Sequence, residues 1–135
     1  MDLLKSMLIS AAGLRAQGSR MRVISENLAN ANSMGKTPGA DPYRRKMLTF
    51  RNVLNREMGV DVITPGKIIR DKAEFETRFD PGHPAADKNG AVKLPNVNSL
   101  LEMTDMREAQ RSYEANLSAI DAAKTMLSRL VELLR

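Results

Sequence analysis

Apolar residues recur at helical spacing near the start of the chain. Four large ones stand seven positions apart, at Met7, Leu14, Met21 and Leu28. A second row, offset by three positions, holds mostly small residues, and one of them is Gly18. This three-four spacing is typical of a helix that packs on another helix. Because a glycine in mid-helix costs about 1 kcal/mol relative to alanine, we expect Gly18 to let a neighbouring backbone come close.

The end of the chain repeats this pattern. Large side chains again recur every seven positions, at Met106, Tyr113, Ile120, Leu127 and Leu134. Asn116 is the polar exception on the row offset by three, and no glycine or proline follows Pro95. The spacing therefore predicts a second long helix. Four carboxylates fall on its polar side, where a solvated face is expected: Glu102, Asp105, Glu108 and Glu114.

Residues 34–96 are built differently. They hold all six prolines and six of the eight glycines. Val60 and Val62 alternate with polar residues before Pro65-Gly66, residues 75–79 alternate in the same way, and Asn89-Gly90 precedes a short apolar run. Alternation bounded by such turn residues predicts short strands. We expect a small β element in an irregular, loop-rich middle.

These patterns predict a mainly α fold made of two long terminal helices. The three segments are residues 1–33, 34–96 and 97–135. One interpretation is a self-sufficient pair of helices. The other is a pair that is incompletely folded alone, because its apolar stripes leave surface to spare and most helical stability comes from packing. Neither the seams nor the long middle segment decides whether the two helices run parallel or antiparallel.

Charge and composition narrow the choice of partners. The net charge is +5, and residues 34–96 carry twelve basic and eight acidic residues. Because the acidic residues are mixed among the basic ones, a dedicated nucleic-acid groove is disfavoured and an acidic protein partner stays open. No apolar run reaches the length of about 20 residues that a membrane span needs. The start is a poor match to a secretory signal, so we expect any export to use another route.

Residues for catalysis or cofactor binding are scarce. The chain has no cysteine, and its one histidine, His83, stands in a Pro-Gly-His-Pro turn without a neighbouring nucleophile. Gly35 and Gly39 lack the ending of a phosphate loop, and no aspartate series has the spacing of a metal loop. We expect no enzyme activity, no cofactor and no metal site.

The stretch from Ser25 to Lys46 ends the first helix in asparagines and a basic turn. Asn27, Asn30 and Asn32 crowd together before Tyr43, Arg44 and Arg45. Asparagine competes for backbone groups and tolerates left-handed turns, so it ends helices well. Its amides can also bond a neighbouring chain. With no catalytic chemistry nearby, we interpret this stretch as a joint between subunits.

Three stretches resemble one family. "SENLANANSMGKTPGADPYRRK" is similar to the motif that closes the first helix of flagellar rod and hook proteins, and "EMTDMREAQRSYEAN" is similar to their C-terminal helix. "FDPGHPAADKNGAVKLPNVN" resembles the central signature of the proximal-rod members, except that His83 and Ala91 stand where asparagine and tyrosine are usual. Over nearly its whole length the chain is identified as a member of the axial proteins of the bacterial flagellum.

The resemblance implies a structural role. Axial proteins pair their terminal helices antiparallel, as a coiled coil, and stack them into a hollow tube in the periplasmic rod, with the middle segment further out. The implied partners are copies of the chain, other proximal and distal rod subunits, the adaptor at the MS ring and the type III export apparatus, which takes substrates without a cleaved signal. No nucleic acid and no membrane insertion are implied. A candidate export-gate motif runs from Phe50 to Leu54, and residues 75–79 match the same short pattern.

Two sets of residues follow from these observations. We expect the contacts between subunits to involve Asn27, Asn30, Asn32, Tyr43, Arg44, Arg45, Met106, Tyr113, Asn116 and Leu127. We expect the helix seam to use Met7, Leu14, Met21, Leu28, Ile120 and Leu134. The alternative functions are a basic coiled coil that binds nucleic acid, which salt-dependent retention on DNA would favour, and a wall-cleaving enzyme, which the missing acid–base groups disfavour.

Overall fold

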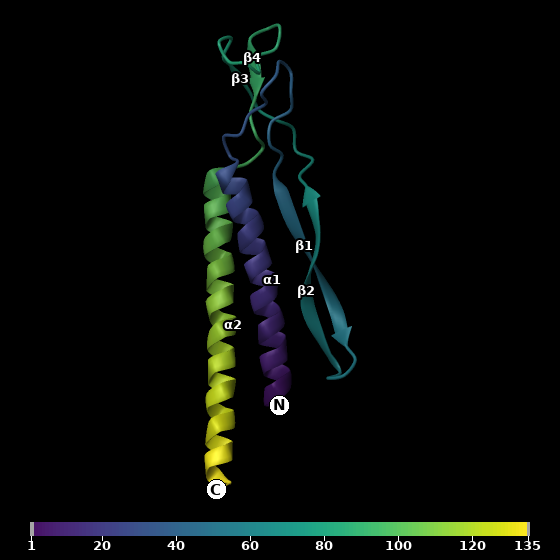
Figure 1. The fold of residues 1–135 in the computed structure, drawn as a ribbon, viewed down its shortest axis with the longest axis vertical. Helices are drawn as coiled ribbons and strands as arrows, with labels where there is room; N and C mark the ends of the chain where they lie inside the picture. Colours follow the sequence, from purple (N-terminus) through teal and green to yellow (C-terminus); the bar gives the residue numbers. More distant parts are fainter. Residues whose placement is uncertain (1, 135) are drawn as a thin grey trace. The chain divides into compact units, whose positions relative to one another are not determined.

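The computed structural model describes residues 2–134, so Met1 and Arg135 of the predicted terminal segments lie outside it. It contains two helices and two small sheets (Figure 1). The elements are α1 (Leu3–Ala29), β1 (Lys46–Asn55), β2 (Val60–Arg70), β3 (Thr77–Phe79), β4 (Ala91–Lys93) and α2 (Ser99–Leu133). The prediction of two long terminal helices around a middle with a small β element is confirmed.

The chain forms two compact units. Unit 1 comprises the residues up to Met21, residues 48–67 and the residues from Arg107 onward. Unit 2 comprises residues 22–47 and 68–106. Each terminal helix contributes to both units, so the units interleave the three segments expected from the sequence. That division by segment stays a prediction.

Asparagine side chains mark both helix boundaries in unit 2. The Glu26 carbonyl in the last turn of α1 accepts two hydrogen bonds from Asn30, from its amide Nδ2 at 2.8 Å and from its backbone N–H at 3.2 Å. At the start of α2, Asn98 Oδ1 accepts hydrogen bonds from the backbone N–H groups of Leu100 and Leu101 at 3.0 and 3.2 Å. This is the N-cap arrangement that asparagine favours. The asparagine-rich stretch therefore ends α1 as its sequence predicts.

Strands β1 and β2 form a two-stranded hairpin. Gly59 closes its turn at a φ of 64° and donates to the Asn55 carbonyl at 2.8 Å, a backbone conformation that favours glycine. Strand β1 was not predicted, and the prediction that β2 ends at Pro65-Gly66 is wrong, because β2 continues to Arg70. Proline is tolerated here because each strand of a two-stranded ribbon is an edge strand, where a missing N–H can face solvent.

The predicted small β element of unit 2 is present as β3 and β4. The strands pair antiparallel, with Thr77 opposite Lys93 and Phe79 opposite Ala91. Val92 of β4 is fully buried, and Gly90 before it has a φ of 75°. A Cβ at position 90 would lie 2.9 Å from the Phe79 ring, so the turn requires glycine for both reasons.

Unit 1 buries small side chains where α1 and α2 lie side by side. Ala12, Ala16, Ala109 and Ala123 are its buried apolar residues among those described. A Cβ at position 13 would lie 2.8 Å from the Asn116 amide, so the helices approach closely at Gly13. The expectation for Gly18 is wrong, because nothing lies within 4 Å of the space its Cβ would take.

The two glycines of α1 provide a matched test. Gly18→Ala is expected to raise the free energy of unfolding by about 0.5–1 kcal/mol, because alanine loses less backbone entropy and meets no neighbour. Gly13→Ala gains the same propensity but pushes its methyl group into Asn116, so we expect it to destabilise. Urea unfolding of both variants measures the difference, and Asn116→Ala should rescue Gly13→Ala. Equal stabilisation by the two alanines would contradict the close approach at Gly13.

The predicted seam residues are less buried than Ala12, Ala16, Ala109 and Ala123. Five of them are partly exposed: Met7, Leu14, Met21, Leu28 and Ile120. Leu134 is 88% exposed. The described part of a single chain therefore leaves much of the large apolar stripe uncovered.

Candidate assembly site

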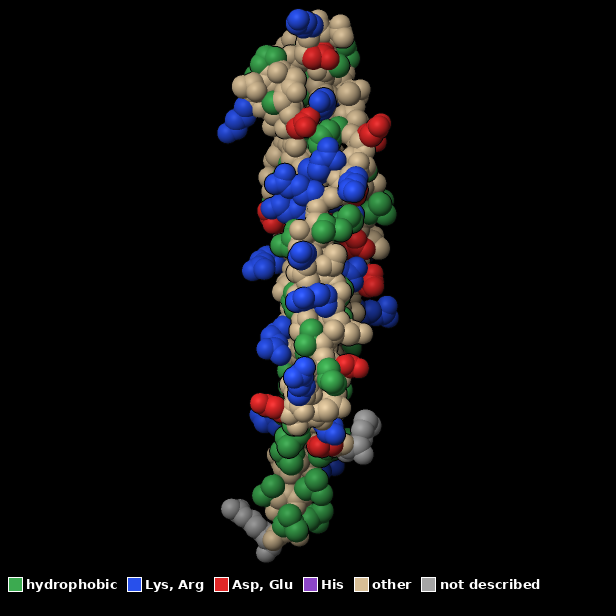
Figure 2. Space-filling model, turned by 90° about the vertical axis from the view of Figure 1, so that its right-hand side faces the viewer, with side chains coloured by type: hydrophobic (Ala, Val, Ile, Leu, Met, Phe, Trp, Pro, Cys, Tyr) green, Lys and Arg blue, Asp and Glu red, His purple; other side chains and the backbone are tan. Residues whose placement is uncertain are grey.

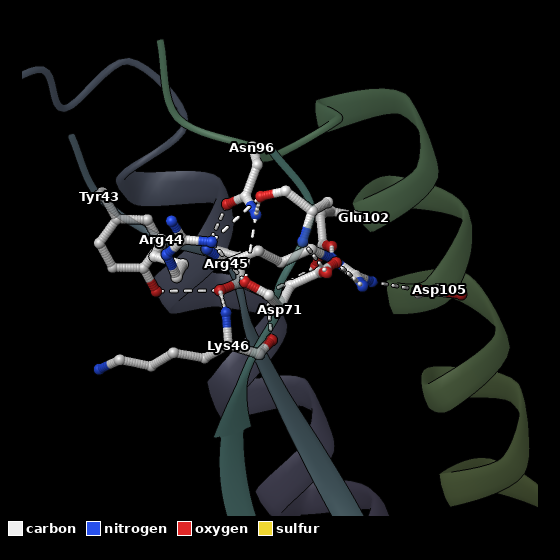
Figure 3. A network of polar contacts seen from close by, with 10 residues as sticks. Tyr43, Arg44, Arg45, Lys46, Asp71, Asn96, Glu102 and Asp105 are labelled. Carbon is white, nitrogen blue, oxygen red and sulfur yellow. Dashed lines mark hydrogen bonds and ion pairs between the residues drawn. The ribbon is translucent and has the colours of Figure 1, made fainter. Parts of the chain in front are cut away.

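A polar network in unit 2 joins five stretches of the chain (Figure 3). It lies where the last turns of α1 meet residues 43–46 and the first turn of α2. Residues 71–73 and Asn96 complete it from the connecting segments. We call Asn27, residues 43–46, Asp71, Asn96, Glu102 and Asp105 the polar hub. The hub lies in the stretch that the sequence interprets as a joint.

Asn27 lies at the centre of the polar hub and is 1% exposed. Its amide Nδ2 donates to the Lys46 carbonyl at 2.8 Å and to Glu102 Oε2 at 3.0 Å. Its Oδ1 accepts from the Tyr43 hydroxyl and from the Lys46 backbone N–H, both at 2.9 Å. All four hydrogen-bonding positions of a buried amide are thus used within the chain.

The buried carboxylate of Glu102 is paired with Arg45. Arg45 Nε lies 2.5 Å from Glu102 Oε1, and its other nitrogens lie 3.5 Å from Asp71 and 3.6 Å from Asp105. The Arg45 backbone N–H also donates to Asn96 Oδ1 at 2.8 Å. Glu102 is 1% exposed, so it needs such a partner, since a buried charge without one is costly. Arg45 therefore connects α2 with both connecting segments.

Arg44 holds the segment after β2. Its guanidinium donates to the carbonyls of Asp71 and Ala73 at 2.9 and 3.1 Å and lies 4.1 Å from the centre of the Phe75 ring. Asn96 Nδ2 donates to the same Ala73 carbonyl at 3.2 Å. Carbonyl bonding and cation–π contact together fix the direction in which the chain leaves the hub.

Two pKa values in the polar hub differ from their usual values. Burial opposes the charged form of Arg45, but the hydrogen bonds and charges of Glu102 and Asp71 outweigh it and raise the pKa of Arg45. Burial, and then the carboxylates of Glu26 and Glu102, raise the pKa of the Tyr43 hydroxyl. Both groups therefore keep the protonation states that the hydrogen bonds require at neutral pH.

The polar hub holds segments together and offers no catalytic arrangement. Residues 2–134 contain no group of three or more histidine or acidic side chains placed to hold a metal. His83 accepts the Ala85 backbone N–H at its Nδ1, at 3.0 Å, as part of a turn. None of the described helices is long and apolar enough to cross a bilayer.

The structure places the residues expected at the joint in different roles. Asn27, Tyr43 and Arg45 are bonded within the chain. Asn30 caps α1, and Asn32 is exposed beyond the helix. The internal bonds show that much of the polar stretch first shapes its own chain. A role in contacts between subunits stays a prediction.

The other candidate residues are not part of the polar hub. Met106, Tyr113 and Asn116 are partly exposed along α2, and Leu127 is exposed near its end. Phe50 and Leu54 of the candidate export motif are 37% and 56% exposed on β1. The structure brings none of these six side chains into the network.

Four residues of the polar hub outside the stretch from Ser25 to Lys46 were not predicted as site residues: Asp71, Asn96, Glu102 and Asp105. Glu102 was expected on the solvated face of α2, but this residue is among the most deeply buried. The row offset by three positions contained a signal, because Glu102 stands seven positions before Ala109, which is also fully buried. A carboxylate on a buried row of a helix needs a cation as its partner. Arg45 is that partner of Glu102.

Large apolar side chains remain exposed in both units. In unit 2 they include Ile68, Ile69 and Phe79, and Leu100, Leu101 and Met103 in the first turns of α2. In unit 1 they gather at the end of α2, where Figure 2 shows a group of hydrophobic side chains at its lower end. Lys and Arg side chains are spread along the same view. Contiguous exposed apolar side chains mark binding surfaces.

The chain is similar to known proteins of one kind. A family model described as "Flagellar basal body rod FlgEFG protein C-terminal" matches residues 88–133. The chain is 50% identical to the flagellar basal-body rod protein FlgC of Agrobacterium fabrum over 94% of this chain and 91% of that relative. It is 39% identical to the FlgC protein of Bacillus subtilis over 95% of each chain, and 35% identical to that of Salmonella typhimurium over 98% of each. The chain therefore belongs to the FlgC family of flagellar basal-body rod proteins.

Proposed function

We propose that the chain is a subunit of the proximal part of the rod, where it packs with copies of itself and with other axial proteins into a hollow shaft. The shaft transmits torque and lets later subunits pass. Membership of the FlgC family makes the chain a structural protein of the flagellar basal body rather than an enzyme, and implies assembly with other rod components.

Exposed apolar side chains are the structural observation that carries this proposal. Large ones are exposed within each unit, among them Leu100 and Leu101 in unit 2 and Leu130 and Leu134 in unit 1. Monomeric proteins rarely leave such side chains in contiguous patches. A subunit that packs with its neighbours in an assembly covers them.

We further propose that α1 and α2 pack as an antiparallel coiled-coil pair. Three observations within unit 1 support this direction. Leu3 and Ser6 line the same pocket as residues 119–126, Gly13 lies against Asn116, and Arg20 lies 3.6 Å from Glu108. The position along α2 falls as the position along α1 rises. The bond between Asn27 and Glu102 in unit 2 follows the same order.

Cysteine pairs test the direction of the two helices. The chain has no native cysteine, so the background is clean. Ser6→Cys with Ala122→Cys should crosslink within one chain, because both residues line one pocket. Ser6→Cys with Met106→Cys is the matched control and should not. Oxidation of assembled rods followed by non-reducing electrophoresis gives the result, and a crosslink in the control pair alone would rule out the antiparallel arrangement.

The finer partners are also part of the proposal. They are the other proximal and distal rod subunits, the adaptor at the MS ring and the type III export apparatus, with delivery to the periplasmic rod without a cleaved signal. Exposure of Phe50 and Leu54 on β1 supports a role as an export motif, because a gate can reach both side chains. The FlgC relatives give no support to the alternative of a nucleic-acid-binding coiled coil.

We retain the joint between subunits in a modified form. The polar hub holds Tyr43 and Arg45 from within the chain, and we propose that it thereby fixes the exposed residues around it for a neighbour. Asn32 is exposed just beyond α1, and partly exposed Arg44 lies close to the surface. In this form the polar hub positions Asn32 and Arg44, and these two residues make the contact with the neighbouring subunit.

Deletion of the gene tests the proposed function. The deletion strain is expected to be non-motile, and its purified basal bodies should lack the rod while the membrane ring remains. Expression of the wild-type chain should restore both. Electron microscopy of basal bodies, with swimming assays, measures the outcome, and intact rods in the deletion strain would overturn the proposal.

A further inference from the structure

The last turns of α2 carry an apolar stripe that is exposed in the described structure. Ala123 is the last buried residue of the helix, and Leu127, Leu130 and Leu134 continue the same face. These three leucines are 41%, 50% and 88% exposed. We call residues 124–134 the tail. The tail's leucines continue the helix face that packs on α1 further up α2. We therefore expect this face of the tail to pack on another apolar surface in the same way.

Unit 1 also contains an apolar groove. Its volume is about 450 Å³, within the roughly 300–1,000 Å³ of pockets that bind molecules. It is lined by the start of α1, by the turn of the β1–β2 hairpin and by one residue of α2. Six apolar side chains form most of the lining: Leu4, Met7, Leu8, Ala11, Met58 and Ile120.

The tail cannot fill the groove of its own chain. Ile120 lines the groove from α2, and the tail leucines follow it by 7 to 14 positions on the same continuous helix. At about 1.5 Å per residue they lie roughly 10–20 Å further along the helix axis. Any tail that enters this groove therefore belongs to another molecule.

Charge favours a second copy of the chain as that molecule. Glu57 is the one charged residue that lines the groove in the described structure. The described tail carries two cations, Lys124 and Arg129, and one carboxylate, Glu132, so its net charge is +1. A basic amphipathic helix end thus matches an apolar groove with an acidic rim, and both surfaces occur on the same chain.

We propose that the tail of each subunit docks in the unit 1 groove of a second copy. Leucines of the tail enter between Met7 and Met58, and Lys124, which flanks the leucine face, lies near Glu57 of the copy that receives it. The contact is heterologous, because different patches of the two copies meet, and such contacts build rings or open helical arrays. The inference rests on the proposed assembly into a rod and names a contact within it.

Mixed cysteine variants test the docking directly. One chain carries Leu130→Cys and the other Met58→Cys, and both are expressed in the deletion strain. Oxidation of basal bodies is expected to give a species of twice the chain mass, which each variant alone does not give. The matched control replaces Met58→Cys by Leu101→Cys, in the exposed apolar patch at the start of α2.

Two results would overturn the inference while the proposed function stands. They are motile cells with intact rods but no crosslink between positions 130 and 58, and a crosslink between positions 130 and 101 in its place. Missing rods with the wild-type chain would instead count against the proposed function itself.

A charge exchange gives a second readout that does not depend on rods. Lys124→Glu and Glu57→Lys should each weaken self-association of the purified chain by about two- to fivefold, as expected for an exposed ion pair. The double variant should restore the wild-type value in sedimentation experiments. Both positions are exposed, so the fold is not at risk. A double variant that associates no better than the single ones would overturn the contact.

Discussion

Replacing Glu102 with alanine is expected to lower the free energy of unfolding of unit 2 by about 2–3 kcal/mol. The change removes a charge-assisted hydrogen bond to Arg45 and one bond from the buried Asn27 amide. Removing one partner of a fully buried pair costs roughly 3–5 kcal/mol. Arg45 keeps Asp71 and Asp105 within 3.6 Å and is 24% exposed, so the expected loss is smaller.

Glu108→Ala is the matched control on the same helix. The Glu108 side chain is 65% exposed and lies 3.6 Å from Arg20, so its loss should change the stability by less than about 1 kcal/mol. Urea unfolding compares the two alanine variants, and hydrogen exchange at the Lys46 amide, which donates to Asn27, reports on the polar hub itself. Equal effects of the two substitutions would mean that the hub does not stabilise unit 2.

The helices were predictable because their signal is local and repeated. Apolar spacing over many turns indicates a helix whatever it packs on. The asparagines that end α1 were informative in the same way, since Asn30 bonds a carbonyl only four positions away. Local chemistry of this kind is fully visible in a sequence.

The contacts between distant segments were not predictable from the same patterns. Strand β1 was missed because its exposed run Arg51-Asn52-Val53-Leu54 shows no clean alternation. Glu102 was placed in solvent because its cation lies 57 positions away, at Arg45. Gly18 was chosen because it stands on the offset row, whereas the side chain that comes close to α1, Asn116, lies against Gly13. For Glu102 and for the glycines, the deciding side chain belongs to a segment remote in the chain.

The structure also changes the meaning of the asparagine-rich stretch. From the sequence, the amides of Asn27 and Asn30 are free to bond a neighbour. In the folded chain both are occupied, one by the polar hub and one by the end of α1. A pattern that identifies an assembly family can therefore act inside the subunit, by fixing the geometry on which assembly depends.

Leu127→Asp is expected to abolish rod assembly and motility while leaving the isolated chain folded. Leu127 is 41% exposed and lies beyond the last buried position of α2, so an aspartate there meets water in the monomer. In the assembly we propose, the tail is covered by a neighbour. A carboxylate must then lose its hydration against the apolar side chains of the neighbour, which costs several kcal/mol at every copy of the contact.

Ser128→Asp is the control, because it adds the same charge one position away and off the leucine face. It should support normal rods. Both variants keep residues 1–54 unchanged, so both should still be exported, and their amounts outside the cytoplasm separate a failure of assembly from a failure of export. Circular dichroism of the purified chains should show equal helix content.

Motile cells with Leu127→Asp rods would show that the tail stays exposed to solvent, whereas a loss of motility with both variants would point to net charge rather than to the leucine face. Loss with Leu127→Asp alone is the result that an interface along Leu127, Leu130 and Leu134 requires.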